Sequence, residues 1–156
     1  MSKEHILVCL SSSPSNERIV RMAGKMAQAF CGSLTALYVQ TPGDDDMNAE
    51  DTVRLQANMR LAQQLGAEIV TTHGEDVPTQ IAEYARLSDV TKIVIGRSGV
   101  KRRHFWSEPM LTEQLIALAP EVDIHIIPDC GSLQKLSQEP ADRYLPGVFR
   151  PPGNCF

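Results

Sequence analysis

The chain has 156 residues, 42% of them hydrophobic, a length that suits one domain with a single buried core rather than two. Its formal net charge of -4 argues against a general nucleic-acid-binding protein, because such proteins carry excess positive charge that displaces phosphate counterions. No apolar run approaches the roughly 20 residues of a membrane-spanning helix and the first residues are unlike a secretory signal, so we expect a soluble, cytoplasmic chain without membrane insertion.

The first third of the chain predicts a strand, a turn, a helix and a second strand. Residues 5–10 (HILVCL) are almost continuously apolar, which is typical of a strand covered on both faces in a parallel sheet, and Ser11, Ser12 and Ser13 follow it. Residues 34–39 (LTALYV) predict the second strand. Between them, apolar residues at spacings of three and four predict a helix whose inward side chains are Ile19, Met22, Ala23, Met26, Ala27 and Phe30.

The middle and end of the chain continue the alternation. Residues 44–46, three aspartates, are interpreted as a solvated loop leading into a helix, because no further carboxylate follows at calcium-loop spacing. Helices are predicted over about 49–65, from about residue 77, and over 110–119, and strands over 67–71, 91–95 and 122–127. The predicted inward residues of the second and third helices are Leu55, Met59, Ala62, Leu65, Val77, Ile81, Tyr84 and Ala85.

Five strands alternating with four helices predict a three-layer α/β/α, Rossmann-like domain with a five-stranded parallel sheet. The loops after the first and fourth strands should then lie at one edge of the sheet, where they could share a ligand. We assign residues 1–129 to this domain. Residues 130–156 contain prolines and glycines that interrupt any periodic pattern, so we interpret them as an irregular tail or linker.

A glycine-rich, basic loop follows the fourth strand. Gly96, Arg97, Ser98 and Gly99 could place backbone N–H groups and a cation around phosphate, which points to a nucleotide-type ligand. The following cations are Lys101, Arg102 and Arg103. Three interpretations of these cations stay open: they bind phosphate, they dock to an acidic partner, or they belong to a solvated loop.

Catalytic and metal-binding patterns are absent from the sequence. It has no G-x-S-x-G nucleophile elbow and no P-loop, and its four histidines are spread over separate segments. The four cysteines form no C-x-x-C pair, so reduced thiols are expected rather than a zinc site or disulfide framework. We therefore expect neither catalytic residues nor a metal, and a protein that is not an enzyme.

The order of these landmarks resembles the universal stress protein superfamily and, within it, the cytoplasmic segment of the KdpD potassium-sensor histidine kinases. The resemblance covers roughly residues 4–129. It implies a regulatory nucleotide-binding input domain of an osmosensitive, inner-membrane sensor kinase. Its partners would be other kinase domains or a universal stress protein, with a homodimer as a further option.

Two ligand patterns enter with this resemblance. Members that bind cyclic di-AMP carry S-x-S, twenty residues and F-T-A-x-Y; here Ser11 and Ser13 precede residues 34–38 (LTALY), with leucine in place of phenylalanine. The implied ligand residues in the second strand are Thr35, Ala36 and Tyr38. Members that bind ATP carry an acidic residue after the first strand and a third glycine in the basic loop, where this chain has Ser11 and Pro109. Proline offers no N–H to a phosphate.

Three functions stay open at this point: a cyclic di-AMP sensor, a docking module without a ligand, and a free-standing ATP-binding stress protein. No cofactor is required by any of them. The serines have a purely structural alternative as well, because they could simply turn the chain and cap the following helix.

Overall fold

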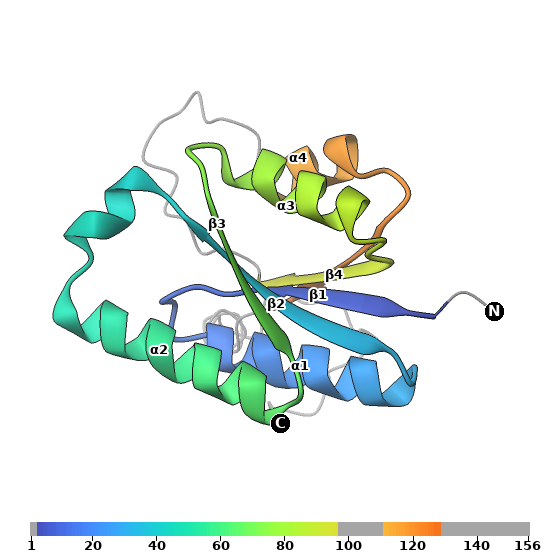
Figure 1. The fold of residues 1–156 in the computed structure, drawn as a ribbon, viewed down its shortest axis with the longest axis horizontal. Coiled ribbons are helices and arrows are strands. Elements are labelled where there is room, and N and C mark those ends of the chain that lie inside the picture. The colour runs from blue at the N-terminus through green and yellow to red at the C-terminus, as the bar shows by residue number, and fades with distance from the viewer. Residues whose placement is uncertain (1–2, 97–110, 129–156) are drawn as a thin grey trace, which may run out of the picture.

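A computed structural model describes residues 3–96 and 111–128. Five parallel strands form one sheet in the order β3-β2-β1-β4-β5 (Figure 1). The strands are β1 His5–Cys9, β2 Ser33–Gln40, β3 Glu68–His73, β4 Lys92–Gly96 and β5 Asp123–Ile127. The helices are α1 Asn16–Ala29, α2 Ala49–Gln64, α3 Val77–Leu87 and α4 Leu111–Leu118, with a short 3-10 helix, η1, at Pro42–Asp46. The predicted parallel α/β fold is confirmed.

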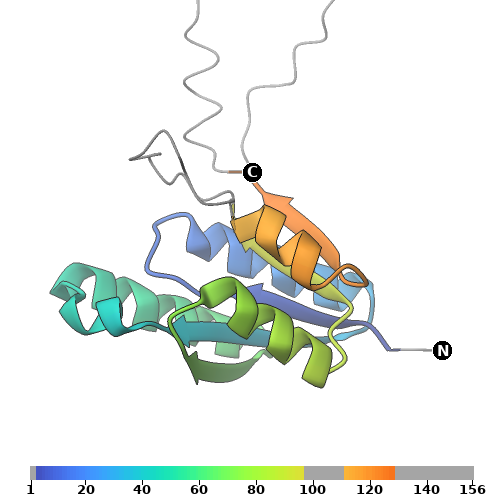
Figure 2. The same cartoon turned by 90° about the horizontal axis from the view of Figure 1, so that it is seen from above.

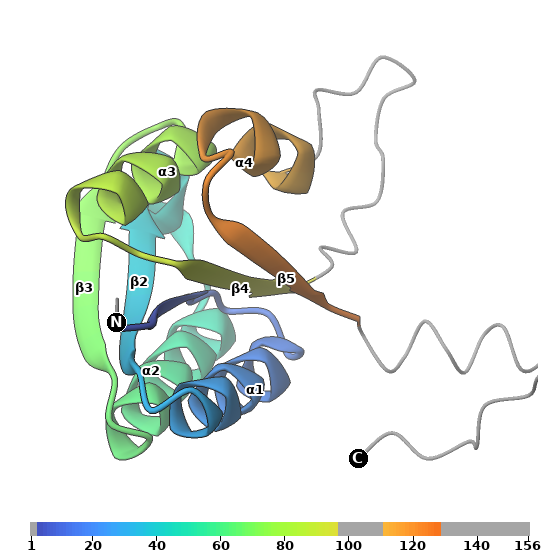
Figure 3. The same cartoon turned by 90° about the vertical axis from the view of Figure 1, so that its right-hand side faces the viewer.

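Two pairs of helices cover the two faces of the sheet. Figures 1 and 3 show α1 and α2 against one face and α3 and α4 against the other. Figure 2 shows the α3 and α4 layer from above, where the two helices lie side by side, in agreement with their direct contact. The domain thus has the three layers that the alternating pattern predicts.

β1 is the central strand, and this position explains the apolar residues in its middle. Ile6, Leu7 and Val8 are each 0% exposed. Ile6 and Val8 belong to the core between the sheet and α1 and α2, whereas Leu7 belongs to the core between the sheet and α3 and α4. Because successive side chains of a strand point to opposite faces, a strand with helices on both sides must be apolar at every position.

The predicted inward faces of the helices need two corrections. Phe30 and Leu65 were expected inside, but they are 48% and 39% exposed. Both are C-cap residues, of α1 and α2 respectively, so their side chains lie beyond the last turn that packs on the sheet. The Phe30 ring instead lies under the Lys92 ammonium group, with 5.1 Å between the ring centroid and Lys92 Nζ.

Several sequence predictions lie outside the described residues: the basic loop after Gly96, and the tail from residue 130. Within residues 3–96 and 111–128, no helix combines the length and apolar character needed to cross a membrane. The three aspartates fall in η1, which leads into α2 as expected. Asp45 and Asp46 are exposed, but Asp44 is partly buried and hydrogen-bonded to Tyr38, so the interpretation as a solvated loop does not hold for it.

Candidate functional site

The strand order defines a switch point between β1 and β4. β2 and β3 lie on one side of β1, and β4 and β5 lie on the other. Val8 is level with Val94 in the parallel register, so both strands end at the same edge of the sheet. Ligands of open α/β sheets bind at the carboxyl ends of the strands where the order reverses in this way. The segment after β1, residues 11–15, lies at this place and is called the serine loop below.

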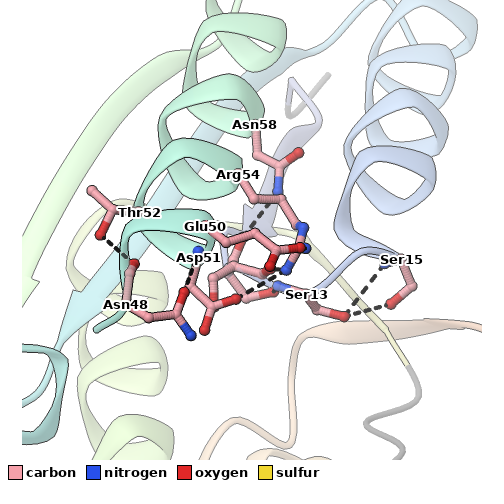
Figure 4. Close-up of polar contacts among 10 residues, drawn as sticks. Ser13, Ser15, Asn48, Glu50, Asp51, Thr52, Arg54 and Asn58 are labelled. Carbon is pink, nitrogen blue, oxygen red and sulfur yellow. Dashed lines mark hydrogen bonds and ion pairs between the residues drawn. The ribbon is translucent and has the colours of Figure 1, made fainter. Parts of the chain in front are cut away.

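Hydrogen bonds within the serine loop organise its hydroxyl groups. The Ser13 amide donates to Ser11 Oγ at 3.3 Å, and the Ser15 amide donates to Ser13 Oγ at 3.4 Å. Ser13 Oγ and Ser15 Oγ are 2.9 Å apart (Figure 4). A serine hydroxyl that accepts from a backbone N–H keeps its own proton to donate. The loop therefore offers hydroxyl donors whose oxygens are already fixed by the main chain.

Asn16 joins the serine loop to the end of β1. Its side chain, in a residue only 2% exposed, donates to the Cys9 carbonyl at 3.0 Å and accepts from the Ser11 amide at 3.2 Å. A buried amide with both ends satisfied specifies one conformation of the chain that it bridges. Sequence reasoning missed this residue, although a polar side chain at the start of an apolar helical face was a visible signal.

α2 holds the other side of the serine loop. Asn58 Nδ2 donates to the Ser11 carbonyl at 2.9 Å, and Arg54 Nη1 donates to the Ser12 carbonyl at 3.0 Å (Figure 4). Arg54 also pairs with Asp51 at 3.0 Å and with Glu50 at 2.8 Å. Neither Arg54 nor Asn58 was predicted as a site residue, because both contact the loop across more than forty residues of sequence.

Tyr38 has its hydroxyl group engaged. The Tyr38 hydroxyl donates to Asp44 Oδ2 at 2.7 Å, and the Thr41 amide donates to the same oxygen at 2.8 Å. Burial raises the pKa of Tyr38 above its ordinary value, and the bond to Asp44 adds to this shift. Burial opposes ionisation of Asp44, but the bonds from Tyr38 and Thr41 outweigh it and lower the pKa of that carboxyl group.

Thr35 and Ala36 lie inside the sheet. They are 2% and 0% exposed, and Thr35 is level with Leu7 rather than with the end of β1. Thr35 Oγ1 is 2.8 Å from His5 Nε2, and His5 Nδ1 is 2.9 Å from the Ser88 carbonyl. The structure therefore places Thr35 in a polar contact between β1 and β2, and does not bring it to the serine loop.

Gly96 ends β4 at the same sheet edge and packs tightly against α1. A Cβ atom on Gly96 would lie 2.3 Å from Ile19 Cδ1. Glycine at position 96 thus permits α1 to pack closely on β4, and this packing role is independent of any ligand. The other predicted members of this loop, Arg97, Ser98, Gly99, Lys101, Arg102 and Arg103, and also Pro109, lie outside the described residues.

The described side chains at this edge are suited to binding polar groups. Burial raises the pKa of the Cys9 thiol to about 12, so it is protonated near neutral pH and is a poor nucleophile. Within residues 3–96 and 111–128, no cluster of three or more histidine, cysteine, aspartate or glutamate side chains could hold a metal ion. The serine loop offers hydroxyl groups, which suit phosphate or ribose oxygens, whereas the amides of Ser11, Ser13 and Ser15 already donate to side chains.

Comparison with protein families decides the affiliation of the chain. The model of the universal stress protein family matches residues 3–120. The chain belongs to the universal stress protein family. Its curated relatives are KdpD sensor proteins, including one from Clostridium acetobutylicum (37% identical over 131 residues, 82% of this chain and 14% of that protein). The Escherichia coli K12 KdpD is 29% identical over 122 residues, 78% of this chain and 13% of that protein.

The domain is thus homologous to one segment of KdpD, and the chain spans only about a seventh of the length of these relatives. Solved universal stress proteins share the fold. UspA from Lactobacillus plantarum superposes with a TM-score of 0.61 at 23% identity, over 81% of this chain and 99% of that protein. A universal stress protein crystallised with cAMP gives a TM-score of 0.61 at 19% identity, over 82% of this chain and 98% of that protein.

Proposed function

We propose that this universal stress domain is the regulatory nucleotide-binding input domain of a KdpD-type potassium-sensing histidine kinase, with cyclic di-AMP as its ligand. Binding would change kinase or phosphatase output through contacts with other domains on the cytoplasmic side of the membrane. The observation that carries the proposal is the serine loop at the switch point of the sheet, with its hydroxyl oxygens fixed by main-chain amides.

The nature of the relatives supports an adenine nucleotide. One fold neighbour was crystallised with cAMP, and a universal stress protein from Archaeoglobus fulgidus with dAMP (TM-score 0.54, 22% identity). The curated relatives that match most of this chain are sensor kinases rather than free-standing stress proteins. Together they favour a nucleotide sensor that is covalently part of a kinase.

In this proposal Ser11, Ser12 and Ser13 bind phosphate or ribose oxygens, and the Tyr38 ring stacks on a base. Arg97, Ser98 and Gly99, with the cations at 101–103, would complete the phosphate site from the loop that follows Gly96. Thr35 and Ala36, which are buried inside the sheet, would not touch the ligand directly.

The test is a calorimetric titration of the purified domain with cyclic di-AMP, and in parallel with ATP and magnesium. Saturable binding of cyclic di-AMP is expected, and Ser11→Ala, Ser13→Ala and Tyr38→Ala should each weaken it about tenfold or more. Ser33→Ala is the matched control, because Ser33 is an exposed serine at the start of β2, at the opposite edge of the sheet. Unchanged affinity in all three site variants would overturn the assignment.

A docking module without a ligand is the second candidate. It is favoured by the engaged Tyr38 hydroxyl and by the packing role of Gly96, which give both residues a structural purpose. This candidate expects no binding of either nucleotide. Charge reversal at Lys101, Arg102 and Arg103 should then weaken the complex with a kinase domain or with a second universal stress protein. An ATP-binding stress protein would instead purify with nucleotide bound.

A further inference from the structure

We propose that α2 sets the conformation of the serine loop through Arg54 and Asn58, which act as positioning residues for the ligand. The inference rests on the proposed function for the identity of the ligand. It concerns residues that neither the serine pattern nor the basic loop contains, and it makes α2 the element through which ligand affinity can be tuned.

The two contacts fix successive peptide groups. Asn58 and Arg54 lie four positions apart, on one face of α2, and donate to the carbonyls of Ser11 and Ser12. In a trans peptide the N–H points opposite to the C=O. Holding both carbonyls toward α2 therefore turns the amides of Ser12 and Ser13 away from that helix. The Ser13 amide is the one that fixes Ser11 Oγ, so the helix controls the hydroxyl through the main chain.

The burial of Asn58 makes its contact costly to lose. Asn58 is 4% exposed. Removing its donor would leave the Ser11 carbonyl without a partner to which it is joined by a part-buried hydrogen bond, and this loss costs more than that of an exposed hydrogen bond. The loop would then relax toward solvent, and the geometry of its hydroxyl groups would change with it.

Arg54 is already balanced by acidic groups of its own helix. Its Nη1 serves both the Ser12 carbonyl and Asp51, and its Nη2 pairs with Glu50 (Figure 4). A guanidinium with two carboxylate partners offers little net charge to a phosphate. The geometry thus suits a residue that orients the loop better than one that attracts the ligand directly.

The first experiment measures amide hydrogen exchange by NMR in the unliganded domain. Arg54→Met and Asn58→Ala should each accelerate exchange at the amides of Ser13 and Ser15 about tenfold, because the fixed carbonyls are released. Arg60→Met is the matched control, since Arg60 is an exposed arginine on the same helix. Unfolding midpoints identify any variant that is globally destabilised, and Arg54→Lys, which keeps a donor, should restore most of the protection. Unchanged exchange in both variants would overturn the inference.

The second experiment is a double-mutant cycle on cyclic di-AMP affinity. Arg54→Met should weaken binding about tenfold in the native background, yet by less than about threefold when Ser11 and Ser13 are already alanine. If Arg54→Met still weakens binding about tenfold in the Ser11 and Ser13 alanine background, and this effect decreases at high salt, Arg54 contacts the phosphate itself. That result would refute a positioning role. If the native domain binds no cyclic di-AMP, the proposed function fails, while the exchange rates still decide whether α2 orders the loop.

Discussion

At the scale of single residues, the Tyr38 hydroxyl is a donor with a fixed partner. Its bond to Asp44 joins β2 to η1, and the Thr41 amide shares the same carboxylate oxygen. The proposed function therefore gives the ring and the hydroxyl of Tyr38 separate tasks. A base could stack on the ring, whereas the hydroxyl stabilises the turn that leads into α2.

This separation predicts different consequences for two substitutions. Tyr38→Phe keeps the ring and should bind cyclic di-AMP within about threefold of the native domain, whereas Tyr38→Ala should lose tenfold or more. Calorimetry with both variants measures the difference. Equal losses would show that the hydroxyl itself contacts the ligand.

The pKa shifts of the pair predict the pH dependence of stability. Because the pKa of Tyr38 is raised in the folded state, its contribution is complete below the ordinary tyrosine value of about 10 and is lost as pH rises further. The lowered pKa of Asp44 acts in the opposite sense, so its contribution is present above about pH 4 and is lost as pH falls.

Absorbance titration should show one of the chain's three tyrosines ionising late, and Tyr38→Phe should remove that component. Urea unfolding of Asp44→Asn should show a weaker loss of stability in acid than the native domain shows.

Gly96 gives a second prediction at this scale. Gly96→Ala should destabilise the domain by about 1–3 kcal/mol, since the new methyl group would meet Ile19 Cδ1. Ile19→Val removes that atom and should recover part of the loss in the double variant, as measured by urea unfolding. Additive losses would mean that the strain lies elsewhere.

At the scale of elements, the first turn of α2 connects a helix cap to the serine loop. Asn48 is the N-cap of α2, and its Oδ1 accepts from the Asp51 amide at 2.8 Å. Asp51 in turn pairs with Arg54, which reaches the Ser12 carbonyl. The helix cap is therefore connected to the serine loop through Asp51 and Arg54.

Asn48→Ala should cost about 1 kcal/mol of unfolding free energy, because one amide of the first turn loses its acceptor. Asn48→Asp keeps an acceptor at the cap and should cost little. Urea unfolding of the two variants tests this. If alanine and aspartate are equivalent, the cap bond contributes nothing to stability.

At the scale of the whole molecule, the described strands and helices within residues 3–96 and 111–128 form two core clusters, one on each face of the sheet, with members from Ile6 to Ile127. We therefore expect a chain that ends after Pro128 to fold and to keep its unfolding midpoint within a few degrees of that of the full chain. Thermal unfolding of the two chains makes the comparison. A large drop would assign residues 129–156 to the domain and contradict the boundary that we predict.

The sequence was informative about the fold where a period of two or 3.6 residues dictates burial. The almost continuous apolar run of residues 5–10 predicted a strand covered on both faces, and β1 is such a strand. The serines after it remain a predicted site. Periodicity could not reveal where a helix passes the end of the sheet, so Phe30 and Leu65 were misplaced. Periodicity also could not predict the contacts of Arg54 and Asn58, because their partners are main-chain carbonyls more than forty residues away. Such contacts leave no local pattern in the sequence.

The central place of β1 also bears on synthesis at the ribosome. β1 is made first, yet one of its two neighbours, β4, ends only at Gly96. At about 5–20 residues per second, roughly 4 to 17 seconds pass between synthesis of Cys9 and of Gly96, before Ile93 and Val94 can pair with Leu7 and Val8. During that interval a three-stranded half-sheet would present one of the most apolar strands of the domain as an open edge. Pairing of β4 with β1 is therefore the step that covers this edge during synthesis.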